Sequence, residues 1–357
     1  MQIKILGAGY GGVRAALDLD RWLGDREAVE ITLVDANDYH QLVTELHKPA
    51  AGTAGEQAMV IPLRDIFRHT RVKLLQARVK DILPQDYQVI LEGGGVLRYD
   101  RLVVALGSVP EYFNIPGVRE HSLTIRSINS ARTIREHLEG AFRRAAEIES
   151  ADERAPYLTV VVAGGGFTGV EIAGELADRL PRLARELGLP AEEVKVVMVE
   201  ALPELLQGFS PHLVEQASRT LAEKKVEVLL GVPITRMEPG AVMLQDGTRL
   251  QAQTVIWSGG VRGNPIVEKR FPTSGRGRAV VNEFLQSPAY PDVYLVGDCA
   301  LALDPATGRP VAPTAQNAVE QGRVAARNIW AEYTGRPLRP YRPVNKGGVV
   351  SVGRGIG

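Results

Sequence analysis

The stretch GAGYGG at residues 7–12 decides the fold, because the chain carries a second copy of it, GGGFTG, at residues 164–169. Each copy follows a short apolar run, formed by Ile3, Ile5 and Leu6 or by residues 160–162, and opens a segment that is predicted to be a helix. Buried parallel strands are typically short apolar runs of this kind. The sequence therefore predicts an α/β fold with two Rossmann-like dinucleotide-binding domains.

The glycines of such a loop have separate roles. In a GxGxxG loop the first permits a tight turn, the second lets the backbone approach a pyrophosphate, and the third lets helix and strand pack closely. The free N–H groups and the positive end of the helix dipole then bind phosphate. In order, these roles fall to Gly7, Gly9 and Gly12 in the first loop and to Gly164, Gly166 and Gly169 in the second. One such loop is a weak signal, but two in matching context indicate two dinucleotides.

Each loop and helix lead to a strand that ends in an acid, Asp35 or Glu200. Both acids lie farther from the first glycine than the usual ~20 residues. A carboxylate at this point accepts hydrogen bonds from ribose hydroxyls and repels a 2′-phosphate, so Glu200 favours NADH over NADPH. The alternative is a solvated acid at a strand end.

Composition excludes several classes of function. The 42 Lys and Arg residues balance the 42 Asp and Glu residues, which argues against a nucleic-acid partner. The only cysteine, Cys299, cannot form a dithiol couple or a cysteine zinc cage, and we expect it to serve packing. His40 and His47 are spaced to share a helix face but lack a third ligand, so no metal site is predicted.

A third signature, DVYLVGD at residues 292–298, reads as a strand ending in Gly-Asp. A helix is predicted to follow at 313–330, beginning at Pro313 or Thr314. A second segment returning to the first module suits a long ligand, and Asp298 could bind the ribityl hydroxyls of FAD. We therefore expect a discontinuous FAD-binding domain at 1–112 and 272–330, an NADH-binding domain at 113–271, and the start of a C-terminal region at 331–357.

Further motifs narrow the family. They are NDYHQLVTELHKPAAGT at 37–53, YDRLVVALGS at 99–108, VVAGGGFTGVEIAGELADRLP at 161–181, VIWSGGVRGNP at 255–265, VGDCA at 296–300 and PTAQNAVEQG at 313–322. With the two loops, these segments resemble the type II NADH:quinone oxidoreductases, non-proton-pumping NADH dehydrogenases among the two-dinucleotide-binding-domain flavoproteins. The resemblance implies hydride transfer from NADH to FAD, and then transfer of two electrons to menaquinone or ubiquinone.

The same resemblance implies roles for individual residues. Glu171 would lie near the nicotinamide, although it could simply complement the helix dipole. Gln316, Glu320 and Lys346 would lie near the flavin and the quinone. Further dinucleotide contacts are implied for Thr44, Val79, Gly107, Gly259, Gly297 and Ala315.

Glu320 departs from the family pattern, which has Gln at the end of its AQxxxQ motif. A glutamate can donate a hydrogen bond to a quinone only when it is protonated. Glu320 is therefore either a proton donor for quinone reduction, with a pKa raised in an apolar tunnel, or a solvated helix acid.

The resemblance also implies a homodimer bound peripherally to the cytoplasmic side of the cell membrane. Family members usually continue beyond the position of Gly357 into a membrane-docking region, which we expect to be missing here, so that the chain as given would be soluble. Two rival functions stay open. One is a soluble NADH-dependent reductase of a ferredoxin-like or rubredoxin-like carrier, and the other is a non-catalytic NADH sensor.

Overall fold

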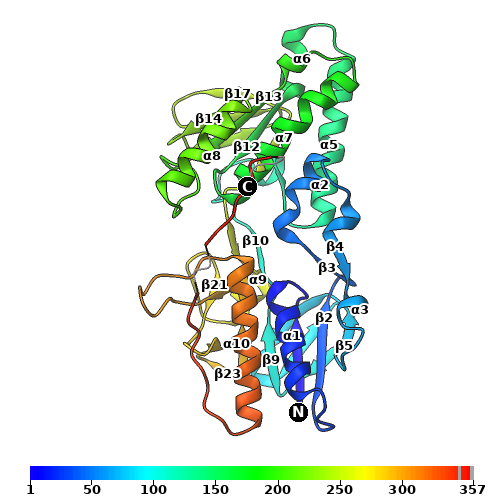
Figure 1. The fold of residues 1–357 in the computed structure, drawn as a ribbon, viewed down its shortest axis with the longest axis vertical. Coiled ribbons are helices and arrows are strands. Elements are labelled where there is room, and N and C mark those ends of the chain that lie inside the picture. Colours follow the sequence, from blue (N-terminus) through cyan, green and yellow to red (C-terminus); the bar gives the residue numbers. More distant parts are fainter. Residues whose placement is uncertain (345–346, 354–357) are drawn as a thin grey trace. The chain divides into compact units, whose positions relative to one another are not determined.

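The computed structural model describes residues 1–344 and 347–353 (Figure 1). Their contacts divide them into two compact units. The first unit comprises residues 1–41, 60–109 and 261–344, and the second comprises 42–59, 110–260 and 347–353. The domain boundaries expected from the sequence describe which residues would bind FAD and which would bind NADH, and they stay a prediction. The boundaries of the compact units differ from these expected boundaries. The chain passes from the first unit to the second at residue 110 and back at residue 261, and residues 42–59 also belong to the second unit.

The first unit is built on a six-stranded sheet with the order β22-β23-β9-β1-β2-β5. The central strands pair in parallel and bury their apolar residues, as in Ile3, Ile5 and Leu6 of β1. Only β22 pairs antiparallel, with β23. The strands are β1 (Gln2–Leu6), β2 (Glu30–Asp35), β5 (Lys73–Gln76), β9 (Arg101–Val104), β22 (Gln286–Ser287) and β23 (Tyr290–Leu295).

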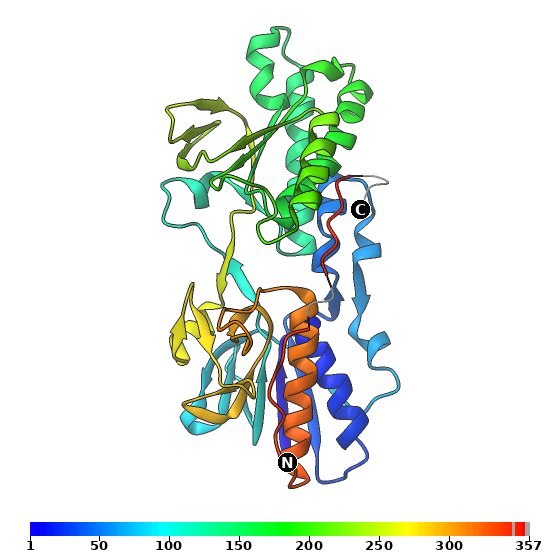
Figure 2. The same ribbon diagram turned by 60° about the vertical axis from the view of Figure 1, so that its left-hand side comes forward.

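Two long helices of the first unit lie side by side, α1 (Tyr10–Leu23) and α10 (Ala315–Tyr333) (Figures 1 and 2). They can approach closely because glycines face each other at the contact. A Cβ atom on Gly322 would lie only 2.2 Å from the carbonyl oxygen of Gly11. This packing places the start of α10 beside the first glycine loop.

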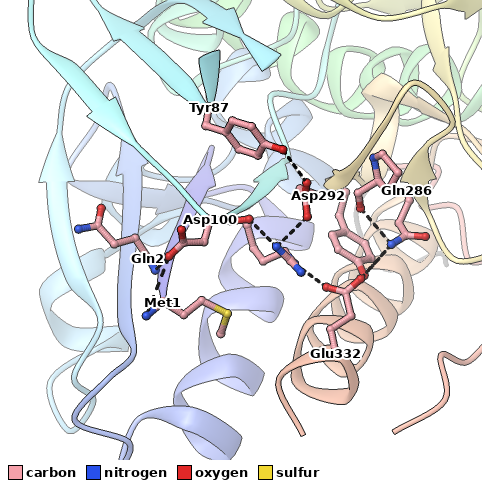
Figure 3. Close-up of polar contacts among 10 residues, drawn as sticks. Met1, Gln2, Tyr87, Asp100, Gln286, Asp292 and Glu332 are labelled. Atoms are coloured by element: carbon pink, nitrogen blue, oxygen red, sulfur yellow. Dashed lines mark hydrogen bonds and ion pairs between the residues drawn. The ribbon is translucent and has the colours of Figure 1, made fainter. Parts of the chain in front are cut away.

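The C-terminal turn of α10 is tied to the sheet by a polar network around Glu332 (Figure 3). The Glu332 carboxylate accepts hydrogen bonds from Nε of Arg101 at 2.6 Å, the hydroxyl of Tyr294 at 2.9 Å and Nε2 of Gln286 at 3.1 Å. Arg101 also pairs with Asp292 at 2.7 Å. The network therefore fixes the helix at the end opposite to the glycine loop.

Smaller elements complete the first unit. Val79–Leu83 begins a three-stranded antiparallel sheet whose second hairpin turns at residues 93–95. The remaining elements are β3 (Tyr39–Gln41), β4 (Val60–Pro62), α3 (Leu63–Ile66), β6 (Val79–Leu83), η3 (Pro84–Asp86), β7 (Gln88–Leu91), β8 (Val96–Arg98), β10 (Ser108–Pro110, at the unit boundary), β19 (Val261–Gly263), α9 (Pro265–Arg270), β20 (Thr273–Ser274), β21 (Arg278–Val280), η5 (Gly297–Cys299) and β24 (Ala300–Leu301).

The second unit contains a parallel sheet with the order β11-β18-β12-β13-β14. Its central strand β12 is buried along its whole length, which agrees with the apolar run before the second glycine loop. The strands are β11 (Leu123–Thr124), β12 (Thr159–Ala163), β13 (Lys195–Glu200), β14 (Val226–Leu230) and β18 (Thr254–Trp257).

The longest helices of this unit are α5 (Ile128–Ala146) and α7 (Phe167–Glu186). A capping box between Ser127 and Ser130 begins α5, and Gly166 begins α7. The other elements are η1 (Val43–Glu45), α2 (His47–Ala51), η2 (Glu56–Met59), α4 (Val118–His121), α6 (Ala151–Leu158), η4 (Ala191–Glu193), α8 (Pro211–Glu223), β15 (Ile234–Glu238), β16 (Ala241–Leu244) and β17 (Arg249–Gln251).

Most elements predicted from local patterns are present, but one is not. The helix predicted after the Gly-Asp signature is present as α10, and the side chain of Thr314 caps it. The idea that His40 and His47 share a helix is wrong, because His40 lies in β3 and His47 begins α2. In the described part of the chain, no helix is both long and apolar enough to span a bilayer.

Candidate functional site

The first glycine loop leaves room only in front of its helix. Gly7 has a φ of +98°, and a Cβ atom there would lie 2.3 Å from the carbonyl oxygen of Ala105. A Cβ atom on Gly12 would lie 1.8 Å from the carbonyl oxygen of Gly7. By contrast, no atom lies within 4 Å of the place where a Cβ atom of Gly9 would be. The fold itself therefore requires the first and third glycines, and the second faces open space at the start of α1.

The second loop repeats this arrangement almost atom for atom. Gly164 has a φ of +113°, and a Cβ atom there would lie 2.7 Å from the carbonyl oxygen of Ser258. A Cβ atom on Gly169 would again lie 1.8 Å from the carbonyl oxygen of the first glycine. Gly166, which begins α7, again has no neighbour within 4 Å of its Cβ position. Each loop thus presents the free N–H groups of a helix start to an open space that a pyrophosphate can enter.

The two strand-end acids are held in the same way. One carboxylate oxygen of Asp35 accepts the backbone N–H of Ala8 at 2.6 Å, and one of Glu200 accepts the N–H of Gly165. The other oxygen of each acid accepts an N–H two residues farther along the chain, at 2.8 Å in both cases. Each acid therefore lies against its own glycine loop, where its remaining lone pairs can accept hydrogen bonds from ribose hydroxyls.

An aromatic pair borders each loop, and the two pairs differ. Tyr10 packs edge-on against His40 at 5.0 Å between ring centroids, and Nδ1 of His40 donates to the carbonyl of Ala8 at 2.8 Å. At the second loop, Phe167 packs edge-on against Phe209 at 4.8 Å. The first border is polar and the second is wholly apolar.

The Gly-Asp signature forms a turn between β23 and β24. Gly297 adopts a φ of +73°, and its N–H donates to the side-chain oxygen of Gln321 at 2.7 Å. The carboxylate of Asp298 accepts the hydroxyl of Ser108 at 2.8 Å. Sequence reasoning missed Gln321 and Ser108 as supports of this turn, although both lie within the motifs that carry the resemblance.

A buried arginine lies behind this turn. Arg278 is 9% exposed and donates to the carbonyl oxygens of Ala300 at 2.6 Å and Val311 at 3.2 Å. Burial lowers the pKa of its guanidinium, while the charge of Asp298 opposes that shift. The buried position of Arg278 was not predicted from the sequence, because an arginine that follows a glycine is typical of an exposed loop.

Gln316 and Glu320 lie in the first two turns of α10, which Ala315 begins. The side-chain amide of Gln316 donates to the carbonyl of Val344 at 2.7 Å. Glu320 is half-buried, and its charge adds to the burial that raises the pKa of Tyr341. These groups therefore belong to the same unit as Asp298 and the first glycine loop.

Glu171 lies in the second unit, in the first turns of α7, and faces a histidine. Its carboxylate oxygen is 3.5 Å from Nδ1 of His47, which is 3% exposed. Burial raises the pKa of Glu171 to about 7, and burial lowers the pKa of His47. The spacing of this histidine gave sequence reasoning no sign that it would face Glu171.

The other predicted residues are spread over both units. Gly107 has a φ of +66°, and a Cβ atom on Gly259 would lie 2.7 Å from the ring of Trp257. Val79 is buried in β6 of the first unit, whereas Thr44 is exposed in η1 of the second. Lys346 lies outside the described residues.

Cys299 is fully buried beside the Gly-Asp turn. Its thiol lies 3.3 Å from the carbonyl oxygen of Val296, and burial raises its pKa to about 11. The reactive thiolate is therefore disfavoured. Within residues 1–344 and 347–353, no group of three or more His, Cys, Asp or Glu side chains is placed to hold a metal ion.

Comparison with known proteins agrees with this geometry. Residues 1–322 match the model of the pyridine nucleotide-disulphide oxidoreductase family. The chain is 36% identical over 355 residues to a type II NADH:quinone oxidoreductase of Staphylococcus aureus, covering 99% of this chain and 87% of the relative. The chain belongs to this family of oxidoreductases.

Solved structures with low sequence identity share the fold. NDH2 from Plasmodium falciparum in complex with NADH matches with a TM-score of 0.87 at 19% identity, over 99% of this chain and 88% of that one. The sulfide:quinone oxidoreductase of Aquifex aeolicus matches with a TM-score of 0.77 at 19% identity, over 94% and 78%. The expected α/β fold of the two-dinucleotide flavoproteins is thus confirmed.

FAD is the cofactor of the family and NADH is the substrate, and the described residues fit two such groups. Both contain a pyrophosphate, and the chain has two open helix starts, at Gly9 and Gly166, each with an acid for a ribose. The family is named for a disulphide, yet this chain has a single buried cysteine. Its chemistry therefore cannot use an internal dithiol.

Proposed function

We propose that the first unit binds FAD, the second binds NADH, and the protein transfers two electrons to a quinone without pumping protons. The observation that carries this proposal is the pair of matching glycine loops in a chain with one buried cysteine. Two open helix starts favour two dinucleotides, and the lack of a thiol pair favours an external electron acceptor. The 36% identity to a type II NADH:quinone oxidoreductase favours a quinone as that acceptor.

The first unit offers groups for each part of FAD. The N–H groups at the start of α1 would hold the pyrophosphate, Asp35 the ribose, and Asp298 the ribityl hydroxyls. The N-terminus of α10 carries partial positive charge and would stabilise negative charge that develops close to it. When bound, FAD would accept a hydride from NADH and supply two electrons to the quinone.

The second unit would orient NADH by the same means, with the start of α7 at the pyrophosphate and Glu200 at the ribose. We propose that Gln316 and Glu320 contact the quinone. The amide of Gln316 can donate a hydrogen bond to a quinone oxygen, and Glu320 can do so when protonated. Glu320→Ala should slow quinone reduction but not the reduction of bound FAD by NADH. Equal steady-state rates in the variant and the parent would exclude that role.

The decisive experiment separates the two half-reactions. Anaerobic NADH is added to FAD-loaded protein while the flavin absorbance band is followed, and a menaquinone analogue, a ferredoxin or a rubredoxin is then added. We expect NADH to bleach the band and the quinone to restore it rapidly. Fast recovery with a carrier protein alone would instead identify a carrier-protein reductase, and no bleaching at all would support an NADH sensor.

The preference for NADH is tested at Glu200. Replacing Glu200 with Gln removes the negative charge that would repel a 2′-phosphate and keeps a hydrogen-bonding side chain. The ratio of kcat/KM for NADH to that for NADPH should fall by roughly tenfold, which corresponds to about 1.4 kcal/mol. An exposed acid of the same unit, Glu227→Gln, is the control and should leave the ratio unchanged.

We also propose that the protein is a homodimer that binds peripherally to the cytoplasmic face of the membrane. The support is chemical, because respiratory quinones dissolve in the bilayer and the enzyme must meet them there. Co-sedimentation with vesicles and light scattering test the two parts of this proposal. A mass equal to one chain would contradict the homodimer. A lack of vesicle binding by a form that carries the expected C-terminal docking region would contradict the peripheral membrane binding.

A further inference from the structure

A buried positive charge lies behind the Gly-Asp turn of the first unit. Only 9% of Arg278 is exposed, at the start of β21, and β21 pairs in parallel with β24 through Ala279 and Ala300. Because β24 follows the turn directly, this pairing brings Arg278 within the electrostatic reach of Asp298. A guanidinium stays ionised in proteins, so the interior of the first unit contains a fixed cation at this place.

One nitrogen of this guanidinium joins two segments of the chain. Nη2 donates to the carbonyl oxygen of Ala300 at 2.6 Å, just after the turn, and to that of Val311 at 3.2 Å, shortly before α10. The N–H of Val311 in turn donates to the carbonyl of Ala302 at 2.9 Å. Arg278 therefore ties the Gly-Asp turn to the segment that leads into α10, and the proposed function assigns both of these parts to FAD.

These bonds do not satisfy the guanidinium completely. Its Nε atom is buried and has no hydrogen-bond partner within residues 1–344 and 347–353. The two carbonyl oxygens are neutral, so they solvate the charge without cancelling it. Arginine is rarely buried without a carboxylate, because the loss of hydration is costly. Among the charged groups near Arg278, the half-buried Asp298 favours its ionised form most strongly.

A third group registers both charges. Cys299 is fully buried, and burial is the main cause that raises the pKa of its thiol to about 11. The charge of Asp298 adds to that rise in pKa, whereas the charge of Arg278 opposes it. The carboxylate and the guanidinium therefore act within one poorly hydrated region, where opposite charges interact more strongly than they do in water.

We propose that Arg278 is a positioning residue for the flavin, and that its buried charge offsets the charge of Asp298 and so favours the two-electron reduction of bound FAD. The inference rests on the proposed function for the place of FAD in the first unit, and on the contacts of that unit for its residues. Asp298 would hold the ribityl hydroxyls, and Arg278 acts through Asp298 and through the turn that carries it.

The charge balance of flavin reduction gives Arg278 this effect. In NADH + FAD → NAD⁺ + reduced FAD, the C4–H bond of the nicotinamide breaks, and the hydride brings both electrons to the flavin ring. The ring thereby gains one negative charge. A carboxylate at the ribityl chain opposes that gain, and a buried cation beside the carboxylate compensates for it.

A redox titration of the FAD-loaded protein measures this effect without NADH or quinone. Dithionite is added under anaerobic conditions, and the midpoint potential is read from the flavin band beside an indicator dye. Arg278→Met keeps a long side chain but removes the charge. In this variant the binding of reduced relative to oxidised FAD should weaken roughly tenfold, which lowers the two-electron potential by about 30 mV. Arg278→Lys keeps the charge and should stay closer to the parent.

The matched control is Arg309→Met, which removes an exposed positive charge from the same unit. Solvent and salt screen an exposed charge, so the control should leave the potential unchanged.

Variants at Asp298 test whether the two charges offset each other. Asp298→Asn removes the negative charge but keeps an acceptor oxygen, so the potential should rise. Arg278→Met/Asp298→Asn removes both charges and should return close to the parent value. The double variant leaves no unmatched charge in the buried region. If Arg278→Met alone does not fold, the double variant is compared with Asp298→Asn, and the same tenfold difference is expected.

The outcomes separate a charge effect from a purely structural clamp. An Arg278→Met protein that is less stable but has the potential of the parent would overturn the proposal. So would a double variant that stays as low as Arg278→Met, or one that equals Asp298→Asn. If the FAD-loaded parent does not reduce quinones, the proposed function fails, while the redox titration still decides the role of Arg278.

Discussion

At Glu171, two opposing effects act on a single carboxyl group. The N-terminal turns of α7 favour its negative charge, an effect of about 0.3–1 kcal/mol. Burial opposes that charge and raises the pKa from 4.5 to about 7, which corresponds to roughly 3 kcal/mol at about 1.4 kcal/mol per pKa unit. Desolvation therefore outweighs the helix dipole, and the folded protein holds a proton here that an unfolded chain would release.

This raised pKa predicts a dependence of stability on pH. A carboxyl whose pKa is higher in the folded state stabilises the fold fully below pH 4.5, and the contribution is lost as pH rises through about 7. Glu171→Gln does not titrate, so its free energy of unfolding relative to the parent should rise between pH 4.5 and 7.5, by up to roughly 3 kcal/mol. Urea denaturation at these two pH values measures the change. A constant difference between the two proteins would contradict the raised pKa.

At the scale of the element, the unit that repeats is a strand, a glycine loop and a helix. In each loop, neighbouring backbone atoms leave no room for a side chain at the first and third glycines. The second glycine instead borders the open space in front of the helix. This division predicts that substitutions in one loop will have different effects.

Gly12→Ala should destabilise the protein, because its Cβ atom would lie 1.8 Å from a backbone oxygen that cannot move freely. We expect a loss of about 3 kcal/mol or more in urea denaturation. Gly9→Ala should change the stability of the FAD-free protein by no more than about 1 kcal/mol, the usual scale of an N-cap change. It should nevertheless weaken FAD binding at least tenfold, because the methyl group would occupy the open space. Unchanged FAD affinity in Gly9→Ala would show that no pyrophosphate enters this loop.

The network at the end of α10 predicts a second effect at this scale. Glu332→Ala would leave the buried hydroxyl of Tyr294 and the guanidinium of Arg101 without an acceptor they now use. Removing one partner from such a network costs about 2–4 kcal/mol. Thermal and urea unfolding should show this loss, whereas Glu147→Ala, at an exposed ion pair, should change stability by about 0.5 kcal/mol or less.

Local patterns predicted these repeated elements well, because a strand, a glycine turn and a helix start each depend on neighbours in sequence. Thr314 at the start of α10 follows from capping chemistry alone. The contact between His47 and Glu171 could not be predicted in this way, because it joins two segments far apart in the chain. The hydrogen bond from the N–H of Gly297 to the side chain of Gln321 could not be predicted either. The sequence does not show which backbone N–H a helix glutamine will accept a hydrogen bond from.

At the scale of the whole molecule, the chain belongs to a family named for a disulphide and has a single thiol. Cys299 is fully buried and its pKa is raised to about 11. Iodoacetamide at pH 8 should therefore leave NADH oxidation unchanged in the folded protein and should label Cys299 only after unfolding. Cys299→Ala should retain turnover with a quinone analogue. Rapid inactivation by the reagent would point to a thiol step.

The likeness of the two glycine loops has a consequence for inhibitor design. A compound that imitates only a diphosphate and its ribose would meet nearly the same backbone in both halves of the chain, and would compete for both. Selectivity must come from the bordering rings, where Tyr10 and His40 offer polar edges and Phe167 and Phe209 offer only hydrocarbon. A ligand that extends past the diphosphate toward one of these pairs could block a single half and leave the other in use.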